Sequence, residues 1–281
     1  MSRYLRPGSI DEAVGLLSTD AALRIVAGGT DVYPSLGEAA ARAAFLDIAR
    51  IPGLRGIARD GDHWRIGAAT TWSDVVRAPL PAFFDGLKLA GREVGAIQIQ
   101  NAGTLAGNVV NASPAADGTV ALMALDASVE IAGRDGRRVV PLGDFVTGVR
   151  SVALAPGEIV TALLVPDRPA TSRAGFLKLG ARRYLVISIA MVSAVVDTDE
   201  TGAIAKAGVA VGACSPVARR LPDLEARLVG VPLSEAPDAV LPSDADTLSP
   251  IDDVRARAGY RREAAITLVR RTLAACAKAA R

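Results

Sequence analysis

The stretch QIQNAGTLAGNVVNASPAAD, residues 98–117, combines small residues, amides and two glycines in one segment that ends in an aspartate. An earlier stretch, RIVAGGTD (residues 24–31), interrupts an apolar run with two adjacent glycines. Glycine has no Cβ, so its backbone can adopt a positive φ and can approach a ligand closely. Successive backbone N–H groups in such a segment form a concave site that binds anions, phosphate above all. Both stretches are therefore candidate phosphate-binding loops.

The two candidate loops together favour a ligand that carries two phosphates. Their glycines and polar neighbours are Gly28, Gly29 and Thr30 in the first loop, and Gly103, Thr104, Gly107 and Asn108 in the second. Two separate anion sites suit a diphosphate better than a single phosphate. Asp117 follows the second loop, and its carboxylate can accept hydrogen bonds from a ribose or ribityl hydroxyl. The combination predicts a dinucleotide cofactor.

Each of these features also has a simpler interpretation. Gly28-Gly29 by itself is more often a tight turn, GTLAG (residues 103–107) also fits a close helix contact between small residues, and Asp117 by itself would be an ordinary helix-capping residue. Neither loop is a Rossmann fingerprint, because the chain has no G-x-G-x-x-G in a strand–helix–strand unit, and it has no P-loop lysine. The dinucleotide interpretation therefore depends on both loops together.

Composition excludes several other classes of protein. The 281 residues carry 32 Lys and Arg against 30 Asp and Glu, and no basic block indicates nucleic-acid binding. Two cysteines are too few for an iron–sulfur cluster held by this chain alone, and the single His63, expected to be exposed, excludes a histidine cluster that binds metal. No apolar stretch is long enough for a membrane span. We expect a cytoplasmic protein with no metal site of its own.

Local patterns predict a mixed α+β fold. Ser9 and Glu12 form a capping box before a helix, and Thr71 is a candidate cap for another. Further helices are expected over residues 80–96 and 254–280. Strands are expected, partly as hairpins with Asp-Gly turns, over residues 23–29, 43–54, 55–71, 124–145, 157–166, 174–183 and 187–216. The composition changes near residues 166–174, where PDRPATSRA predicts a domain boundary.

With both loops in view, the sequence resembles the FAD-binding medium subunits of the molybdenum hydroxylases, the family of carbon monoxide dehydrogenase and xanthine dehydrogenase. AGGTD (residues 27–31) is similar to the family's first motif, and QIQNAGTLAGNVVNASPAAD is similar to its second. Other similar segments are YLRPGSIDEAVGLL (4–17), GAATTWSDV (67–75), FLKLGARR (176–183) and GACSPVARR (212–220). The resemblance covers nearly the whole chain.

The resemblance implies a two-subdomain FAD-binding module of the vanillyl-alcohol oxidase (PCMH) type, followed by a smaller α+β C-terminal domain. The FAD-binding module would span residues 1–168, with subdomains of about 1–55 and 56–168. The C-terminal domain, of the carbon monoxide dehydrogenase flavoprotein type, would span residues 172–281.

The resemblance also implies which residues bind FAD, with the diphosphate between the two loops. The expected cofactor-binding residues are Ile25, Val26, Ala27, Gly28, Gly29, Thr30, Asp31, Val32, Gly103, Thr104, Leu105, Ala106, Gly107, Asn108, Asp117, Val160 and Lys178. Asp117 would lie near the ribose region, Val160 would contact FAD through its apolar side chain, and Lys178 would lie near the flavin ring. Without the family, Lys178 could equally be an exposed strand lysine.

Some residues depart from the family pattern. Ala106 replaces a glycine, and Asp31 stands where many members have serine. The Asp31 carboxylate could bond to the backbone or to ribityl hydroxyls, but it would repel phosphate if it turned inward. Trp72 replaces a histidine, and Tyr184 is a candidate for stacking on the flavin.

By resemblance, the protein is an electron-transfer subunit without a catalytic acid or base of its own. A large partner with a molybdopterin cofactor would carry out the substrate chemistry. Electrons would pass through [2Fe-2S] clusters of a small partner to FAD here, and then to NAD, a quinone or oxygen, in a hetero-oligomer. Two alternatives stay open: a self-sufficient FAD oxidase or dehydrogenase of the same fold, and a non-enzymatic nucleotide-binding assembly module. The substrate and the acceptor are not specified by this sequence.

Overall fold

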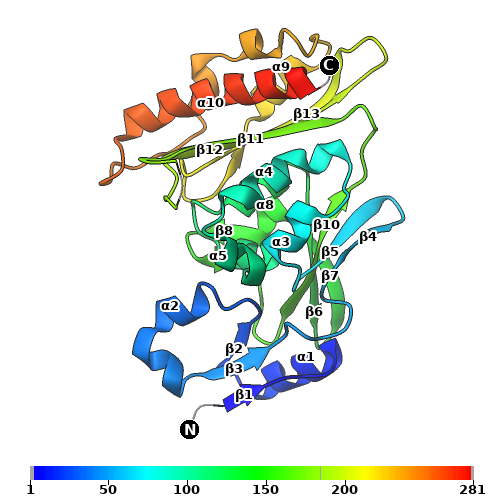
Figure 1. Ribbon diagram of the computed structural model, residues 1–281, viewed down its shortest axis with the longest axis vertical. Helices are drawn as coiled ribbons and strands as arrows, with labels where there is room; N and C mark the ends of the chain where they lie inside the picture. Colours follow the sequence, from blue (N-terminus) through cyan, green and yellow to red (C-terminus); the bar gives the residue numbers. More distant parts are fainter. Residues whose placement is uncertain (1–2, 184, 280–281) are drawn as a thin grey trace.

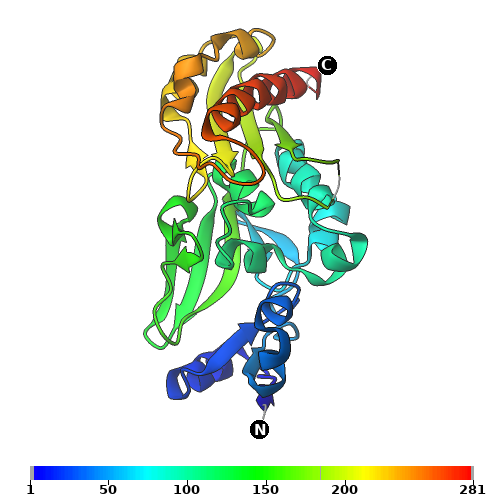
Figure 2. The same cartoon turned by 90° about the vertical axis from the view of Figure 1, so that its left-hand side faces the viewer.

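The computed structural model describes residues 3–183 and 185–279. Three parts follow one another along the long axis, and the chain ends lie at opposite ends of the molecule (Figures 1 and 2). We call them the N-terminal lobe, the middle subdomain and the C-terminal domain. Tyr184, the candidate for flavin stacking, lies outside the described residues.

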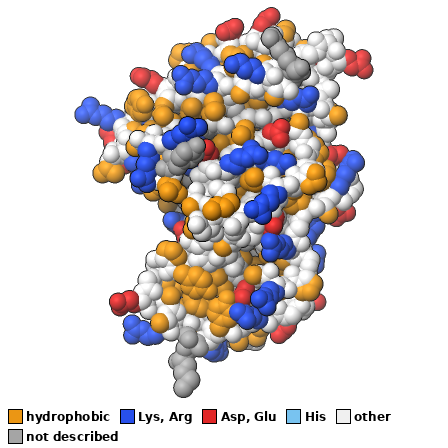
Figure 3. All heavy atoms as spheres, in the orientation of Figure 1, with side chains coloured by type: hydrophobic (Ala, Val, Ile, Leu, Met, Phe, Trp, Pro, Cys, Tyr) orange, Lys and Arg blue, Asp and Glu red, His pale blue; other side chains and the backbone are white. Residues whose placement is uncertain are grey.

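The N-terminal lobe is a small parallel sheet with helices. Its strands are β1 (Arg3–Leu5), β2 (Leu23–Val26) and β3 (Ala44–Asp47), in the order β1-β3-β2. Its helices are α1 (Ile10–Thr19), α2 (Val32–Leu36) and the 3₁₀ helix η1 (Gly37–Arg42). The predicted Ser9 cap is confirmed, since its hydroxyl accepts the Glu12 N–H at 3.1 Å at the start of α1. The reciprocal half of the predicted capping box is wrong, because the Glu12 carboxylate accepts the Gly8 N–H at 2.7 Å instead of that of Ser9. Hydrophobic side chains gather on the visible face of this lobe (Figure 3).

The middle subdomain is built on an antiparallel sheet. Its strands are β4 (Ile57–Asp60), β5 (His63–Gly67), β6 (Ser128–Gly133), β7 (Gly136–Pro141) and β10 (Ile159–Pro166), in the order β4-β5-β10-β6-β7. Two predicted hairpins, β4–β5 and β6–β7, are confirmed. The Asp60-Gly61 turn has Gly61 at φ +62°, as such a tight turn requires.

Helices cover this sheet and carry the second glycine stretch. They are α3 (Trp72–Arg77), η2 (Ala82–Phe84), α4 (Asp85–Glu93), α5 (Ile97–Ala102), α6 (Leu105–Val110), α7 (Asp117–Ala124) and α8 (Leu142–Phe145). A two-stranded ribbon of β8 (Val146–Gly148) and β9 (Ser151–Val152) follows. All eight residues of α7 are buried, because this helix packs on the C-terminal sheet and on helices α4, α6 and α8 of the middle subdomain. Thr71 caps α3 with Asp74 in a reciprocal capping box, as predicted.

The C-terminal domain is an antiparallel sheet between helices. Its strands are β11 (Arg173–Leu179), β12 (Ala190–Thr198), β13 (Ile204–Gly212) and β14 (Arg219–Arg220), in that order. Its helices are α9 (Pro222–Leu228), α10 (Ala258–Ala279) and the 3₁₀ helices η3 (Ala236–Ala239) and η4 (Pro242–Ala245). Helix α10 packs on one face of β11 and β12, while α4 and α7 of the middle subdomain pack on the other (Figure 1).

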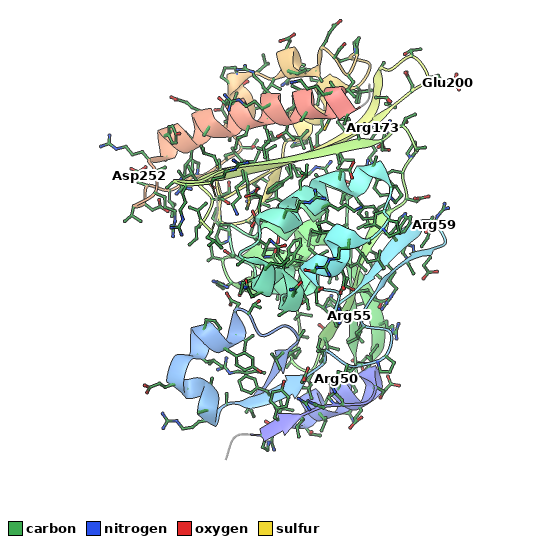
Figure 4. All side chains as sticks on the ribbon, in the orientation of Figure 1. Arg50, Arg55, Arg59, Arg173, Glu200 and Asp252 are labelled. Atoms are coloured by element: carbon green, nitrogen blue, oxygen red, sulfur yellow. The ribbon has the colours of Figure 1, made fainter. Side chains whose placement is uncertain are left out.

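The hairpins and loops at the periphery carry exposed charges. Glu200 lies at the tip of the β12–β13 hairpin and Arg59 lies on the β4–β5 hairpin, and both point away from the body of the molecule (Figure 4). The fold therefore matches the predicted α+β class, with a two-subdomain module followed by a smaller domain.

The segment between β10 and β11, where the sequence predicts a domain boundary, is anchored to both sides. Arg168 is buried, and its guanidinium donates to Asp197 at 2.9 Å and to Asp126 at 2.8 Å. Asp126 belongs to the middle subdomain and Asp197 to strand β12. A buried arginine paired with a carboxylate on each side fixes the junction, so the two parts do not behave as domains on a free tether. The proposed boundaries at residues 168 and 172 stay a prediction.

Candidate functional site

A cavity of about 470 Å³ lies between the N-terminal lobe and the middle subdomain, within the usual range of cofactor sites. The N-terminal lobe lines it with Ile25, Ala27, Gly28, Gly29, Thr30, Asp31, Val32 and Ile48. The middle subdomain lines it with Ala68, Trp72, Val94, Ile99, Gly103, Thr104, Ala106, Gly107, Asn108, Val110, Asn111, Leu154, Ile159 and Val160. Both glycine stretches therefore face one cavity, although they are far apart in sequence.

The first glycine loop needs small residues for contacts within the protein. A Cβ at Gly28 would overlap the Ala102 carbonyl and approach Gly103, so this glycine lets the two loops touch. Gly29 has φ +68°, and a side chain there would overlap the ring of Tyr33. Positive φ occurs at Gly29 but not at Gly28, Gly103 or Gly107, so conformational freedom explains only one of these four glycines.

The same loop leaves a run of backbone donors unused. Within the described residues, the N–H groups of Gly28, Gly29, Thr30, Asp31 and Val32 donate no hydrogen bond to protein atoms. The carbonyls of this loop are used, since that of Gly29 accepts the Tyr33 N–H at 3.2 Å. Consecutive unpaired N–H groups beside a cavity are the donor set that an anion requires.

The second glycine stretch uses most of its donors internally. Thr104 caps α6, and its hydroxyl accepts the Gly107 N–H at 3.0 Å. The Leu105 N–H donates to the Thr70 carbonyl at 3.0 Å, and the Asn108 side chain accepts the Gly118 N–H at 3.0 Å. This stretch therefore offers fewer free donors than the sequence interpretation predicted, because its amides hold the middle subdomain together.

The remaining wall of the cavity is apolar. It consists of Ile48, Ala68, Trp72, Val94, Ile99, Val110, Leu154, Ile159 and Val160. The Trp72 ring is almost fully buried and lies close to Gly91 and Gly118, where added side chains would contact it. The lining thus combines free backbone donors with apolar side chains, which suits a ligand with a phosphate part and a flat aromatic part.

Asp117 and Lys178 form a buried ion pair that joins α7 to strand β11. The Lys178 Nζ lies 3.0 Å from Asp117 Oδ1 and donates to Oδ2 at 3.1 Å, and both side chains are 9% exposed. Burial raises the pKa of the Asp117 carboxyl above its ordinary value, and the charge of Lys178 only partly offsets this. Lys178 is therefore not an exposed strand lysine. It lines a second cavity of about 440 Å³ together with Glu93 and Arg182.

The structure brings most of the predicted cofactor-binding residues to the cavity between the lobes. Four of the predicted residues do not line it, namely Val26, Leu105, Asp117 and Lys178. Val26 and Leu105 are buried directly behind the loops. Whether any of these residues contacts FAD stays a prediction. Sequence reasoning missed Val94, Ile99 and Leu154, whose apolar side chains carry no local signal that separates them from core residues.

Nothing in residues 3–183 and 185–279 resembles a metal site, since these residues hold no cluster of three or more His, Cys, Asp or Glu side chains. Burial raises the pKa of the Cys214 thiol to about 11 and that of Cys276 to about 12, so neither is a ready thiolate ligand. No helix in the part of the chain that the structure describes is long and apolar enough to cross a membrane.

Two family models match this chain. The FAD-binding domain of molybdopterin dehydrogenases matches residues 1–168, and the C-terminal domain of the carbon monoxide dehydrogenase flavoprotein matches residues 176–276.

Individual proteins match over almost their whole length. The nicotine 6-hydroxylase medium subunit of Paenarthrobacter nicotinovorans is 32% identical over 96% of this chain and 95% of its own. The carbon monoxide dehydrogenase medium chain of Hydrogenophaga pseudoflava is 30% identical over 96% and 95%. In a solved structure of reconstituted carbon monoxide dehydrogenase from Oligotropha carboxidovorans, one chain is 28% identical with a TM-score of 0.91, over 100% of this chain and 99% of that one.

Proposed function

From the premise that this chain belongs to the family of FAD-binding subunits of molybdenum hydroxylases, we propose that it is their electron-transfer component. In this proposal, electrons from the [2Fe-2S] clusters of a small partner subunit reach FAD on this chain and leave to an external acceptor. A large partner with a molybdenum cofactor carries out the substrate chemistry.

The observation that carries the proposal is the lining of the cavity between the lobes, which combines free backbone donors with apolar side chains. The N–H groups of the loop from Gly28 to Val32 are unpaired within the described chain. Trp72, Val94 and Val160 line the same cavity with apolar side chains. The loop donors match a diphosphate, which needs several N–H groups and tolerates no bulky side chain nearby. The apolar wall matches a flat aromatic ring system, so the residues present fit FAD.

Each part of the site has a task toward the cofactor. The loop N–H groups would hold the diphosphate, and the apolar wall would hold the ring and exclude water from it. The predicted contacts of Asp117 and Lys178 with the ribose and flavin regions are part of the proposal. The two side chains form a buried ion pair with each other, and Lys178 lines the second cavity. When bound, FAD supplies the redox chemistry, which the protein tunes through the charges and hydrogen bonds around it.

The partners and the location belong to the same proposal. A hetero-oligomer with a molybdenum subunit and an iron–sulfur subunit agrees with the lack of a metal cluster among the described residues of this chain. A cytoplasmic location agrees with two buried, unpaired cysteines, because a reducing compartment keeps thiols free.

A self-sufficient FAD enzyme of the same fold is the second candidate. It would need a base beside a substrate cavity, and Asp31 is the sole ionisable side chain that the described residues place in the lining of the cavity between the lobes. An assembly module without redox activity is the third candidate. It would not need the run of free loop donors.

The test is the visible absorption spectrum of the purified chain, with identification of the ligand that denaturation releases. A flavin spectrum with FAD released supports the proposal, and reduction of that flavin only when the molybdenum and iron–sulfur partners and a substrate are present separates it from a self-sufficient enzyme. A chain that neither contains FAD nor takes it up, alone or with partners, contradicts the proposal.

A further inference from the structure

Arg150 makes an ion pair across the cavity between the lobes. It lies in the turn between β8 and β9, and its Nη1 is 3.5 Å from Oδ2 of Asp31 in the first glycine loop. The same Nη1 donates to the Asn111 carbonyl at 3.3 Å and to the Asn111 side-chain oxygen. Asp31 and Asn111 line the cavity from opposite lobes. The guanidinium therefore links the N-terminal lobe to the middle subdomain beside the proposed cofactor.

The backbone holds Arg150 in this place at an energetic cost. Its φ is +57°, a left-handed conformation that non-glycine residues rarely adopt, and Ala112 beside it has φ +46°. The Arg150 N–H donates to the Ala112 carbonyl at 2.9 Å, which fixes the turn against the end of α6. Such conformations persist where the surrounding structure requires them, and they occur often at binding sites.

The ion pair between Arg150 and Asp31 bears on cofactor binding because Asp31 carries a negative charge. Among the described residues that line the cavity, Asp31 alone is ionisable, and it is an acid. It lies within the run of free N–H groups, where a diphosphate would bring at least two further negative charges. Unscreened negative charges a few ångströms apart repel each other, so the carboxylate has to be neutralised or turned aside.

We propose that Arg150 is a positioning residue that turns the Asp31 carboxylate away from the diphosphate and neutralises its charge. This inference rests on the proposed function, since the anion in question is the FAD diphosphate. The alternative is that Arg150 binds the diphosphate itself. The two explanations predict different FAD binding when Arg150 is replaced. If Arg150 neutralises Asp31, removing the Asp31 carboxylate as well restores FAD binding, whereas it does not if Arg150 binds the diphosphate itself.

The test is a double-mutant cycle on the dissociation constant for FAD, with Arg150→Gln, Asp31→Asn and the double variant. We expect Arg150→Gln to weaken binding by about three- to tenfold, because an exposed pair near a surface has modest energy. Asp31→Asn should bind FAD at least as tightly as wild type. The double variant should bind like Asp31→Asn, since no carboxylate is left to repel the cofactor.

Ionic strength provides a second readout. Salt screens exposed charges, so the binding defect of Arg150→Gln should shrink as salt is raised from low to physiological concentration and above. A defect that came only from altered turn structure would not depend on salt in this way. Thermal melts of the cofactor-free variants show whether each one is folded.

Arg55→Gln is the matched control. Arg55 (Figure 4) is also an exposed arginine paired with an aspartate, with its Nε 2.9 Å from Asp74. Neither residue lines the cavity. This variant should bind FAD like wild type.

Three outcomes would overturn the inference while leaving the proposed function in place, provided that wild type binds FAD. One is an Arg150→Gln variant that binds like wild type. Another is a double variant as weak as Arg150→Gln, which would assign Arg150 to direct contact with the diphosphate. The third is an Asp31→Asn variant that binds FAD as weakly as Arg150→Gln. If wild type itself does not bind FAD, it is the proposed function that fails.

Discussion

The two glycine loops look alike in sequence, but the structure uses them differently. The loop at Gly28 leaves consecutive backbone donors unpaired within the described chain, whereas the amides around Thr104 and Gly107 are mostly used inside the middle subdomain. In the proposed site the Gly28 loop would supply most of the anion contacts, while Ala102 and Gly103 of the second stretch form the surface that this loop touches. A glycine-rich pattern therefore indicates close backbone approach without specifying whether the approaching group is a ligand or another loop.

The largest effect is expected at the point where the two loops touch. Gly28→Val places a Cβ on the Ala102 carbonyl, which is backbone and cannot move aside cheaply. We expect loss of FAD binding and a decrease in the free energy of unfolding of roughly 2–4 kcal/mol, measured by denaturant titration and flavin fluorescence. Gly15→Ala is the control, since Gly15 is an exposed position of helix α1 with open space around it, and this change should be neutral or slightly stabilising. Normal FAD binding by Gly28→Val would contradict the observed contact between the loops.

Breaking the buried ion pair of Asp117 and Lys178 should have the next largest effect, on the free energy of unfolding. Lys178→Met leaves Asp117 buried without its partner, and we expect a loss of roughly 2–4 kcal/mol at neutral pH. Because burial raises the folded-state pKa of Asp117, stability is highest when this carboxyl is protonated and decreases as pH rises through its folded pKa.

The melting temperature of Lys178→Met should therefore be closest to that of wild type in mild acid and farthest from it at neutral pH. Asp117→Asn combined with Lys178→Met should recover part of the loss. A deficit that is constant across pH would rule out this explanation.

Gly107→Val tests the second loop directly. A Cβ there would lie 2.7 Å from the Thr104 hydroxyl that caps α6, and the branched side chain would extend toward the cavity. We expect at least a tenfold loss of FAD affinity with a smaller loss of stability, about 1 kcal/mol, from the weakened cap. Thr104→Val is the paired control, because it removes the cap without filling the cavity. Full FAD occupancy in Gly107→Val would mean that the second loop does not approach the cofactor.

The smallest effect on FAD affinity is expected for a substitution far from both loops, at Asp126. The pKa of Asp126 is lowered, because hydrogen bonds from Lys206 and Arg220 outweigh the effect of burial, which raises it. A lowered folded pKa contributes stability that is present above the unfolded value of about 4 and is lost as pH falls below it. Asp126→Asn should flatten the acid side of the plot of melting temperature against pH while FAD affinity stays unchanged. A change in FAD affinity would show that the junction and the cofactor cavity are coupled.

Sequence reasoning predicted those parts of the fold that local rules determine. The Ser9 and Thr71 caps and the two hairpins depend on neighbouring residues, and all are confirmed. The family and its cofactor came from resemblance across the whole chain, and the family matches agree with it.

The predictions that were incomplete concern contacts between distant residues. The internal use of the amides near Gly107 depends on Thr70, and the partner of Asp31 is Arg150, 119 positions away. The partner of Asp117 is 61 positions away. No local pattern encodes such pairings, because they arise only when the lobes and the C-terminal domain pack together.

The central claim is that the Gly28 loop binds a diphosphate while the apolar wall binds a ring. The most direct measurement is a set of calorimetric titrations of the cofactor-free chain with FAD, riboflavin and ADP. We predict one FAD per chain, competition between ADP and FAD, and much weaker binding of riboflavin, which has no phosphate. Riboflavin that binds as tightly as FAD, or ADP that leaves FAD binding unchanged, would contradict the claim.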